Sequence, residues 1–153
     1  MKTPLFITAE DKIHGDDAVA AILVMEDGRY VMQLRDALPQ IFYPDHWGCF
    51  GGAVNPGEEP LAALYRELRE EVEIEVEGAT QFARFEFDIQ VWPRKVYRNY
   101  YEVRVPNDFL SRAVLREGAA IRAFSGVEIL QQPRVTPYDA FALWLHYRSL
   151  RFR

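Results

Sequence analysis

The pattern of apolar and polar positions predicts strands interrupted by one strong helix. Residues Ala18 to Met25 are apolar on both alternating faces, which is typical of a strand covered on both sides. Asp27-Gly28 then predicts a hairpin turn. The other strands are expected at Tyr30 to Arg35, in a short stretch from Trp47, at Phe82 to Ile89, at Val96 to Val105 and at Ala119 to Phe124.

The clearest helix is expected from Glu58 to Val72. Pro60 is compatible with it because proline is tolerated in the first turn of a helix. Apolar side chains occupy one contiguous arc of this helix and are expected to anchor it to the sheet. They are Leu61, Leu64, Tyr65, Leu68 and Val72.

Two further helices are expected near the end of the chain. Ser125 and Glu128 have the spacing of a capping box and predict a short helix. Thr136-Pro137 opens the last helix, whose packed stripe is expected to consist of Tyr138, Phe141, Trp144 and Leu145. Strands interrupted by a central helix and closed by a terminal one predict an α/β fold with a sheet covered on both faces.

Composition limits the possible functions. The 153 residues fit one domain, 1–153, with residues 1–16 as a lead-in segment. A net charge of −5 argues against a nucleic acid polymer as partner, because such binders usually carry a basic stripe. The chain has no stretch of about 20 apolar residues, the length that a membrane span needs. It has a single cysteine, Cys49, which is expected to be buried. A cytoplasmic protein without a membrane partner is therefore expected.

Glutamates cluster on the central helix. Glu67, Glu70 and Glu71 have i, i+3 and i+4 spacing, so their side chains emerge on one face. Like charges at this spacing destabilise a helix by about 0.2–0.5 kcal/mol each. Arg66, four residues before Glu70, compensates in part, and magnesium would compensate further because it prefers carboxylate oxygens. The spacing alone fits a solvated acidic surface equally well.

The residues around these glutamates are more specific. From Gly52 the chain reads glycine, five residues, Glu58, seven residues, and then Arg-Glu-Leu-Arg-Glu-Glu-Val-Glu-Ile up to Ile74. This run resembles the Nudix box, and only the last glycine differs, since Glu73 stands there. The resemblance implies a MutT-like Nudix hydrolase with an α/β/α sandwich and a mixed, curved β-sheet.

The resemblance also implies roles for individual residues. Magnesium, with manganese as a possible substitute, is expected on Glu67, Glu70, Glu71 and the backbone carbonyl of Gly52. Glu67 or Glu70 can act as the base in some family members, Arg66 is expected to orient the glutamates, and Glu58 to brace the preceding loop. Glu117 is similar to a second acidic position of the family, as a ligand or general base; a plain loop glutamate is an equal alternative.

The implied reaction is hydrolysis of a diphosphate bond in a small nucleoside-diphosphate-linked substrate. A nucleotide sugar or a nucleoside triphosphate is favoured slightly over ADP-ribose. Arg35, Tyr43 and Trp47 are candidate substrate contacts, although a packing role is favoured for Trp47. A homodimer is possible. The alternative is an inactive Nudix-fold module that binds a nucleotide or regulates a partner, and the retained box glutamates argue against it.

The departure at Glu73 affects the end of the helix. A non-glycine residue in a left-handed cap costs roughly 1–2 kcal/mol. Because Glu73 to Glu77 alternates acidic and apolar residues, the helix is expected to pass into a strand without such a cap and to leave the glutamate cluster intact.

Overall fold

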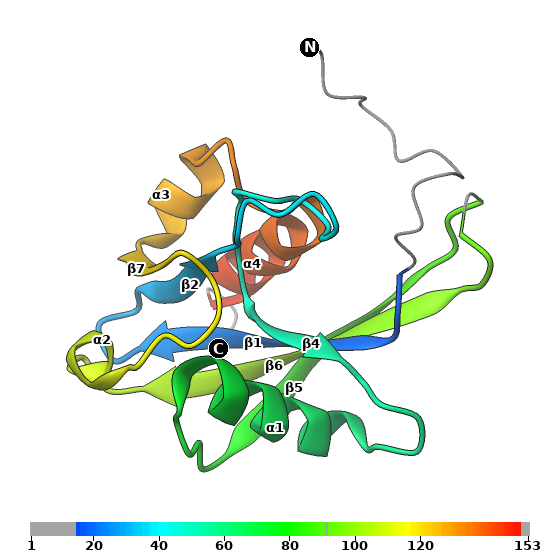
Figure 1. The fold of residues 1–153 in the computed structure, drawn as a ribbon. Helices are drawn as coiled ribbons and strands as arrows, with labels where there is room; N and C mark the ends of the chain where they lie inside the picture. Colours follow the sequence, from blue (N-terminus) through cyan, green and yellow to red (C-terminus); the bar gives the residue numbers. More distant parts are fainter. Residues whose placement is uncertain (1–14, 91, 151–153) are drawn as a thin grey trace.

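A mixed seven-stranded sheet forms the centre of the molecule in the computed structural model, which describes residues 15–90 and 92–150 (Figure 1). Strand β1 pairs in parallel with β6 and antiparallel with both β2 and β4. The strands are β1 (Ala18–Met25), β2 (Tyr30–Leu34), β3 (Trp47–Gly48), β4 (Phe50–Ala53), β5 (Ala79–Phe87), β6 (Val96–Val105) and β7 (Ala120–Phe124).

Helices cover the sheet on both faces. They are α1 (Pro60–Val72), α2 (Phe109–Arg112), α3 (Gly126–Gln131) and α4 (Pro137–Ser149). The alternating side chains of β1 divide between two cores: Val19, Ala21 and Leu23 pack in the core that contains α1, and Ala20, Ile22 and Val24 in the core that contains α4. The predicted α/β fold with a doubly covered sheet is confirmed (Figure 1).

The buried face of α1 differs from the predicted arc. Leu64, Leu68 and Val72 are buried as expected, but Leu61 is exposed. Ala63 and the carboxylate-bearing Glu71 are buried in addition, so the inward face of this helix includes an acidic side chain.

The last helix begins after Thr136 as predicted, but the stripe of side chains predicted to pack against the core was wrong. Phe141 and Trp144 are 50% and 42% exposed and stack on each other, whereas Asp139, Ala142, Leu143 and His146 face the core. The two polar residues are buried because partners from distant strands satisfy them. Asp139 accepts a hydrogen bond from the Tyr100 hydroxyl at 2.8 Å, and His146 lies 2.7 Å from the Tyr30 hydroxyl.

The expected exit of α1 was also wrong. Glu73 adopts the left-handed conformation, with φ 52° and ψ 34°, and residues 73–78 form no strand. The cost of this conformation is offset locally, because the Glu73 backbone N–H donates to the Arg69 carbonyl and Arg116 pairs with the Glu73 carboxylate. The helix remains intact past Glu70 and Glu71, as expected.

Several predicted boundaries shift by a few residues. Strand β5 begins at Ala79 rather than Phe82 and contains a bulge between Gln81 and Ala83. The capping box at Ser125 is present with both of its hydrogen bonds. Most of the predicted lead-in segment 1–16 lies outside the described residues. Within the described part of the chain, no helix has the length and apolar character needed to cross a membrane.

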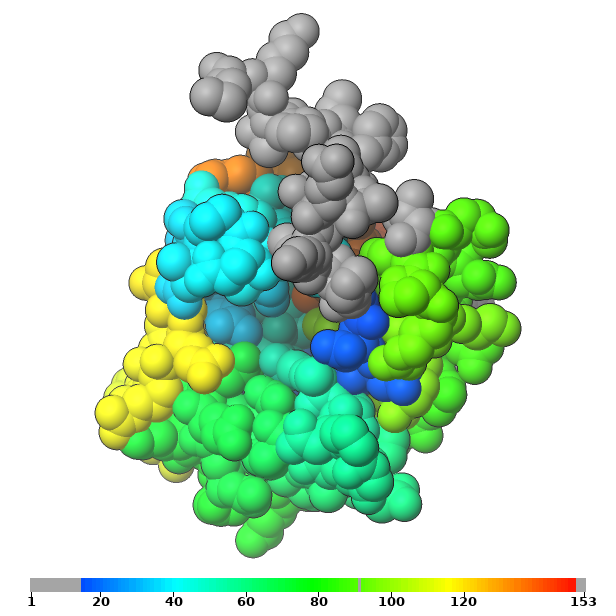
Figure 2. Space-filling model, turned by 45° about the vertical axis from the view of Figure 1, so that its right-hand side comes forward, coloured from blue at the N-terminus to red at the C-terminus, as the bar shows by residue number. Residues whose placement is uncertain are grey.

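A loop and a hairpin frame a hollow beside the sheet. Residues 36–46 connect β2 to β3, and the hairpin between β5 and β6 lies across from them (Figure 2). The ring of Phe42 in the loop contacts the ring of Trp92 in the hairpin edge-on, with centroids 5.9 Å apart.

Candidate functional site

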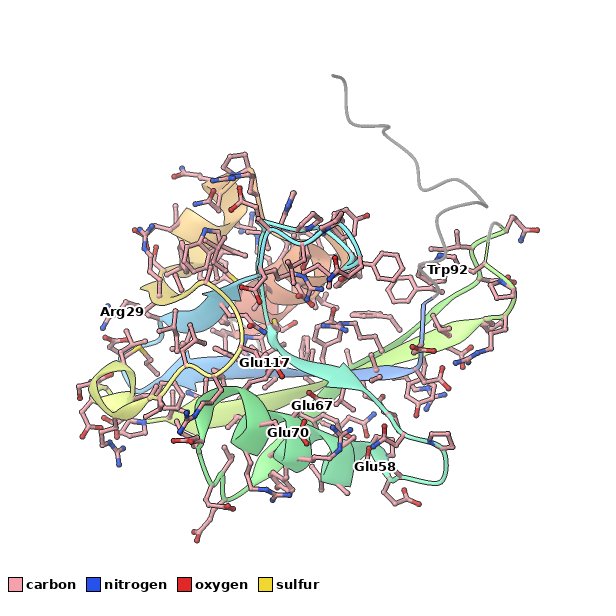
Figure 3. All side chains as sticks on the ribbon, viewed as in Figure 1. Arg29, Glu58, Glu67, Glu70, Trp92 and Glu117 are labelled. Atoms are coloured by element: carbon pink, nitrogen blue, oxygen red, sulfur yellow. The ribbon has the colours of Figure 1, made fainter. Side chains whose placement is uncertain are left out.

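Arg66 organises the acidic side chains around α1, of which Glu58, Glu67 and Glu70 are labelled in Figure 3. Its Nε and Nη2 atoms donate to the two oxygens of Glu58, both at 2.9 Å, in the bidentate geometry that gives strong charge-assisted bonds. Its Nη1 atom donates to Glu67 at 2.8 Å and to Glu70 at 3.3 Å. The expected orienting contacts of Arg66 are therefore present.

Glu58 braces the loop before α1. Its Oε1 atom accepts a hydrogen bond from the backbone N–H of Asn55 at 3.1 Å, and Arg66 also reaches back to the Ala53 carbonyl at 3.0 Å. The hydrogen bonds from Arg66, followed by the one from Asn55, lower the pKa of Glu58 to about 2. Glu58 therefore stays ionised and holds the turn in place.

Only glycine fits at position 52, because the Glu67 carboxylate occupies the space where a side chain would begin. A Cβ atom at Gly52 would lie 2.5 Å from the carboxyl carbon of Glu67, closer than any real contact allows. The Glu67 carboxylate thus packs directly against the backbone of β4. Burial raises the pKa of Glu67, against the lowering effect of Arg66.

Glu71 is the most deeply buried of the box glutamates, with 4% of its surface exposed. The backbone N–H of Gly51 donates to its Oε2 atom at 3.0 Å, and the Gln33 side chain donates to Oε1 at 3.3 Å. Burial raises the pKa of Glu71 to about 8, although these two donors oppose it. The sequence did not identify Gln33, which precedes Glu71 by 38 residues and belongs to no motif.

Glu117 joins the site from the segment before β7 (Figure 3). The backbone N–H of Arg116 donates to the Glu71 carbonyl at 2.7 Å, which places this segment against the end of α1. Burial is the main cause of the raised pKa values of Glu67 and Glu71, and the charge of Glu117 raises both further. The structure therefore brings Glu117 to the same site as the box glutamates.

The predicted substrate contacts lie on and beside the loop 36–46. Arg35 donates from Nε to the Phe42 carbonyl at 2.9 Å and so shapes the loop. Tyr43 is exposed in a left-handed conformation, φ 48°, and its ring edge contacts Tyr138. Trp47 packs edge-on against Phe124, with centroids 4.9 Å apart, which agrees with the favoured packing role.

The donor chemistry of the site suits a hard divalent cation. Carboxylate and carbonyl oxygens are the ligands that magnesium prefers, and a cation would relieve the repulsion among buried carboxylates. As the side chains stand, no group of three or more acidic, histidine or cysteine residues converges as a metal site among the described residues. Arg66 holds Glu67 and Glu70, and Gly51 holds Glu71, so a cation would compete with these hydrogen bonds.

Comparison with known proteins decides the family. The sequence model of the NUDIX domain matches residues 15–144, which is most of the chain. The chain belongs to the Nudix family. Its box residues, from Gly52 to Ile74, are thus those of a Nudix domain, and the departure at Glu73 is a feature of this member. No curated protein matches the chain.

Solved structures share the fold of this Nudix domain. The MutT protein from Methanosarcina mazei Go1 is 21% identical, with a TM-score of 0.73 over 90% of this chain and 96% of that one. The E. coli ORF135 protein is 26% identical, with a TM-score of 0.71 over 92% and 94%. The NUDIX domain of Shewanella oneidensis NrtR, complexed with ADP ribose, is 14% identical, with a TM-score of 0.70 over 90% of each chain. These likenesses confirm the Nudix α/β/α fold.

Proposed function

We propose that this Nudix domain is a magnesium-dependent hydrolase that cleaves a diphosphate bond in a small nucleoside-diphosphate-linked substrate. The observation that carries the proposal is the arrangement of the box residues, in which Arg66 contacts Glu58, Glu67 and Glu70 at once. All of the box glutamates are present in this chain, which favours a hydrolase over a module that only binds a nucleotide. A nucleoside triphosphate or a nucleotide sugar is the favoured substrate.

Glu67, Glu70 and Glu71, with the carbonyl of Gly52, are the groups proposed to hold the metal. When bound, magnesium supplies Lewis acidity to a phosphoryl oxygen and lowers the pKa of a coordinated water. Arg66 keeps two of these carboxylates at fixed positions on α1, and Glu58 keeps the Arg66 guanidinium in place through a bidentate pair. The chain thus places the proposed ligands on α1 and the adjoining strand β4, and a bound cation would replace some of the hydrogen bonds that these carboxylates make with Arg66 and Gly51.

Glu67 is suited to accept a proton from the attacking water. Its carboxylate packs against the backbone of β4 among the proposed metal ligands, and burial raises its pKa in the metal-free protein. Glu117 lies close enough to affect that pKa and is the second candidate for the same role. Separate Glu67→Gln and Glu117→Gln variants, each measured for Mn²⁺ affinity as well as for kcat, distinguish the two, because loss of the base lowers kcat without lowering metal affinity.

The loop 36–46 is the proposed site for the nucleoside part. The exposed ring of Tyr43 offers a face for stacking on a base, and the loop borders the hollow beside the sheet (Figure 2). The ADP ribose in the Shewanella NUDIX domain is itself a nucleoside-diphosphate-linked molecule, which supports this substrate class.

A substrate panel tests the proposal. The purified protein is incubated with magnesium and with nucleoside triphosphates, nucleotide sugars, dinucleotides and ADP-ribose, and the products are separated by chromatography. Cleavage of one class at its diphosphate, lost with chelator, is expected. Nucleotide binding without cleavage of any of these compounds would contradict a hydrolase and favour a binding module.

A further inference from the structure

Gln33 lies between two parts of the acidic site. It is the last residue but one of β2 and is 5% exposed. Its Nε2 atom donates to the Glu71 carboxylate at 3.3 Å. On the other side, its Oε1 atom is so close to Gly118 that a Cβ atom there would be only 2.8 Å away. The Gln33 amide therefore fills the space between Glu71 and the backbone that carries Glu117.

The segment carrying Glu117 is attached on both sides of this amide. The Arg116 N–H donates to the Glu71 carbonyl at 2.7 Å, and the Ala119 N–H donates to the Leu34 carbonyl at 2.8 Å. Between them, Gly118 has a φ of 89° and no room for a side chain. The position of Glu117 relative to Glu71 thus depends on the strand and the amide beneath it.

Packing alone does not account for a glutamine at this position. Burying an amide has a cost unless its polar atoms are hydrogen-bonded, and an apolar side chain of similar volume would fill the space without that cost. The Gln33 donor instead gives Glu71 a second hydrogen bond, on the oxygen that Gly51 does not reach. With a donor on each oxygen, the plane of the carboxylate is fixed.

We propose that Gln33 is a positioning residue of the acidic site, which orients the Glu71 carboxylate for a divalent cation and fixes the approach of the Glu117 segment. It acts through Glu71 and contacts no substrate. This role rests on the proposed metal-dependent function. It adds a residue from β2, outside the Nudix box, to the group that determines metal affinity.

Binding of Mn²⁺ alone, followed by the electron paramagnetic resonance signal of the free ion, tests this role without a substrate. The Gln33→Met variant keeps the length of the side chain and removes the donor. Partners of metal ligands typically contribute about 10–100-fold to metal affinity, so a loss of about tenfold or more is expected. Gln81→Met is the matched control, because Gln81 also donates at 3.3 Å, to Asn99 on the neighbouring strand. Its Mn²⁺ affinity should equal that of the wild type.

The outcomes separate the two proposals. Wild-type Mn²⁺ affinity in Gln33→Met would overturn the positioning role and leave the proposed function standing. Absence of Mn²⁺ binding in the wild-type protein would overturn the metal-dependent function and this role with it. Gln33→Leu is measured in parallel, and circular dichroism reports folding. Loss of the folded state in both variants would show that Gln33 is structural and would also overturn the role.

Discussion

Replacing Glu71 with glutamine should stabilise the metal-free protein while it removes activity. Burial raises the pKa of Glu71 to about 8 from an ordinary value of 4.5. The folded state therefore holds this proton more tightly than the unfolded state does. The stability contributed by the protonated group is fully present below pH 4.5, is lost as the pH rises, and is gone once the pH passes about 8.

The magnitude follows from the linkage between pKa and stability. Each pH unit above the ordinary pKa removes about 1.4 kcal/mol, so the cost of Glu71 at pH 7 is on the order of 3 kcal/mol. A glutamine avoids this cost because it does not ionise. Its carbonyl can accept the Gly51 N–H, and a reversed Gln33 amide can accept from the new side-chain amide.

Urea unfolding in the presence of chelator, from pH 5 to pH 8.5, measures this effect. The free energy of unfolding should be similar for wild type and Glu71→Gln at pH 5 and should favour the variant increasingly toward pH 8. Magnesium should then stabilise the wild type and not the variant, because a ligand of the folded state adds to its stability. Glu77→Gln, at an exposed position beyond α1, is the control and should follow the wild type. A variant whose unfolding free energy runs parallel to that of the wild type would refute the reasoning.

Three further substitutions have definite expected outcomes. Gly52→Ala places a Cβ atom 2.5 Å from the Glu67 carboxyl carbon and so displaces that carboxylate. The variant should lose about tenfold or more in kcat/KM, because a small misplacement of a catalytic group slows the reaction strongly. Unchanged kinetics would contradict a functional role for the close packing of Glu67 on Gly52. Glu73→Gly should be more stable than Glu73→Ala by about 1 kcal/mol in urea unfolding, because both lose the Arg116 pair and only glycine relieves the left-handed strain. Asp139→Ala should lower the free energy of unfolding in urea by about 3–5 kcal/mol, because Arg98 loses its buried partner. A decrease below about 1 kcal/mol would show that the pair is dispensable.

Features encoded within a few residues could be predicted from the sequence. Every position of β1 is apolar, and its two sets of alternating side chains do enter opposite cores. The contact between Arg66 and Glu70 follows from their spacing on one helix, and the capping box at Ser125 follows from local side-chain chemistry. In the last two cases the partners are near neighbours in sequence, so the spacing alone places them together.

Features that depend on distant partners could not be predicted. The last helix buries Asp139 and His146 because Tyr100, Tyr30 and Glu102 satisfy them from other strands, and this arrangement leaves Phe141 and Trp144 outside. An aromatic stripe at helical spacing gave the wrong face for that reason. The left-handed cap at Glu73 is likewise accompanied by a pair with Arg116, which lies 43 residues further along the chain.

Gln33 shows the same limit within the functional site. The box gives the glutamates and the close-packed Gly52, but the second donor to Glu71 comes from a strand that is 38 residues earlier in the chain. A glutamine in an otherwise apolar strand was the only available signal, and it does not specify a partner. Glu117 was named from the family resemblance, but the backbone hydrogen bonds that place its segment leave no mark on side-chain composition.

Magnesium-dependent turnover in Glu70→Gln tests the central claim most directly. Phosphorus-containing products are quantified for the substrate that the wild type cleaves, across a magnesium titration, with Glu77→Gln as the control for loss of one exposed charge. The account predicts turnover that requires magnesium in the wild type and the control, and a loss of about two orders of magnitude or more in Glu70→Gln, comparable to removal of a single electrostatic group from an active site. Full turnover in Glu70→Gln, or cleavage that persists with chelator, would contradict it.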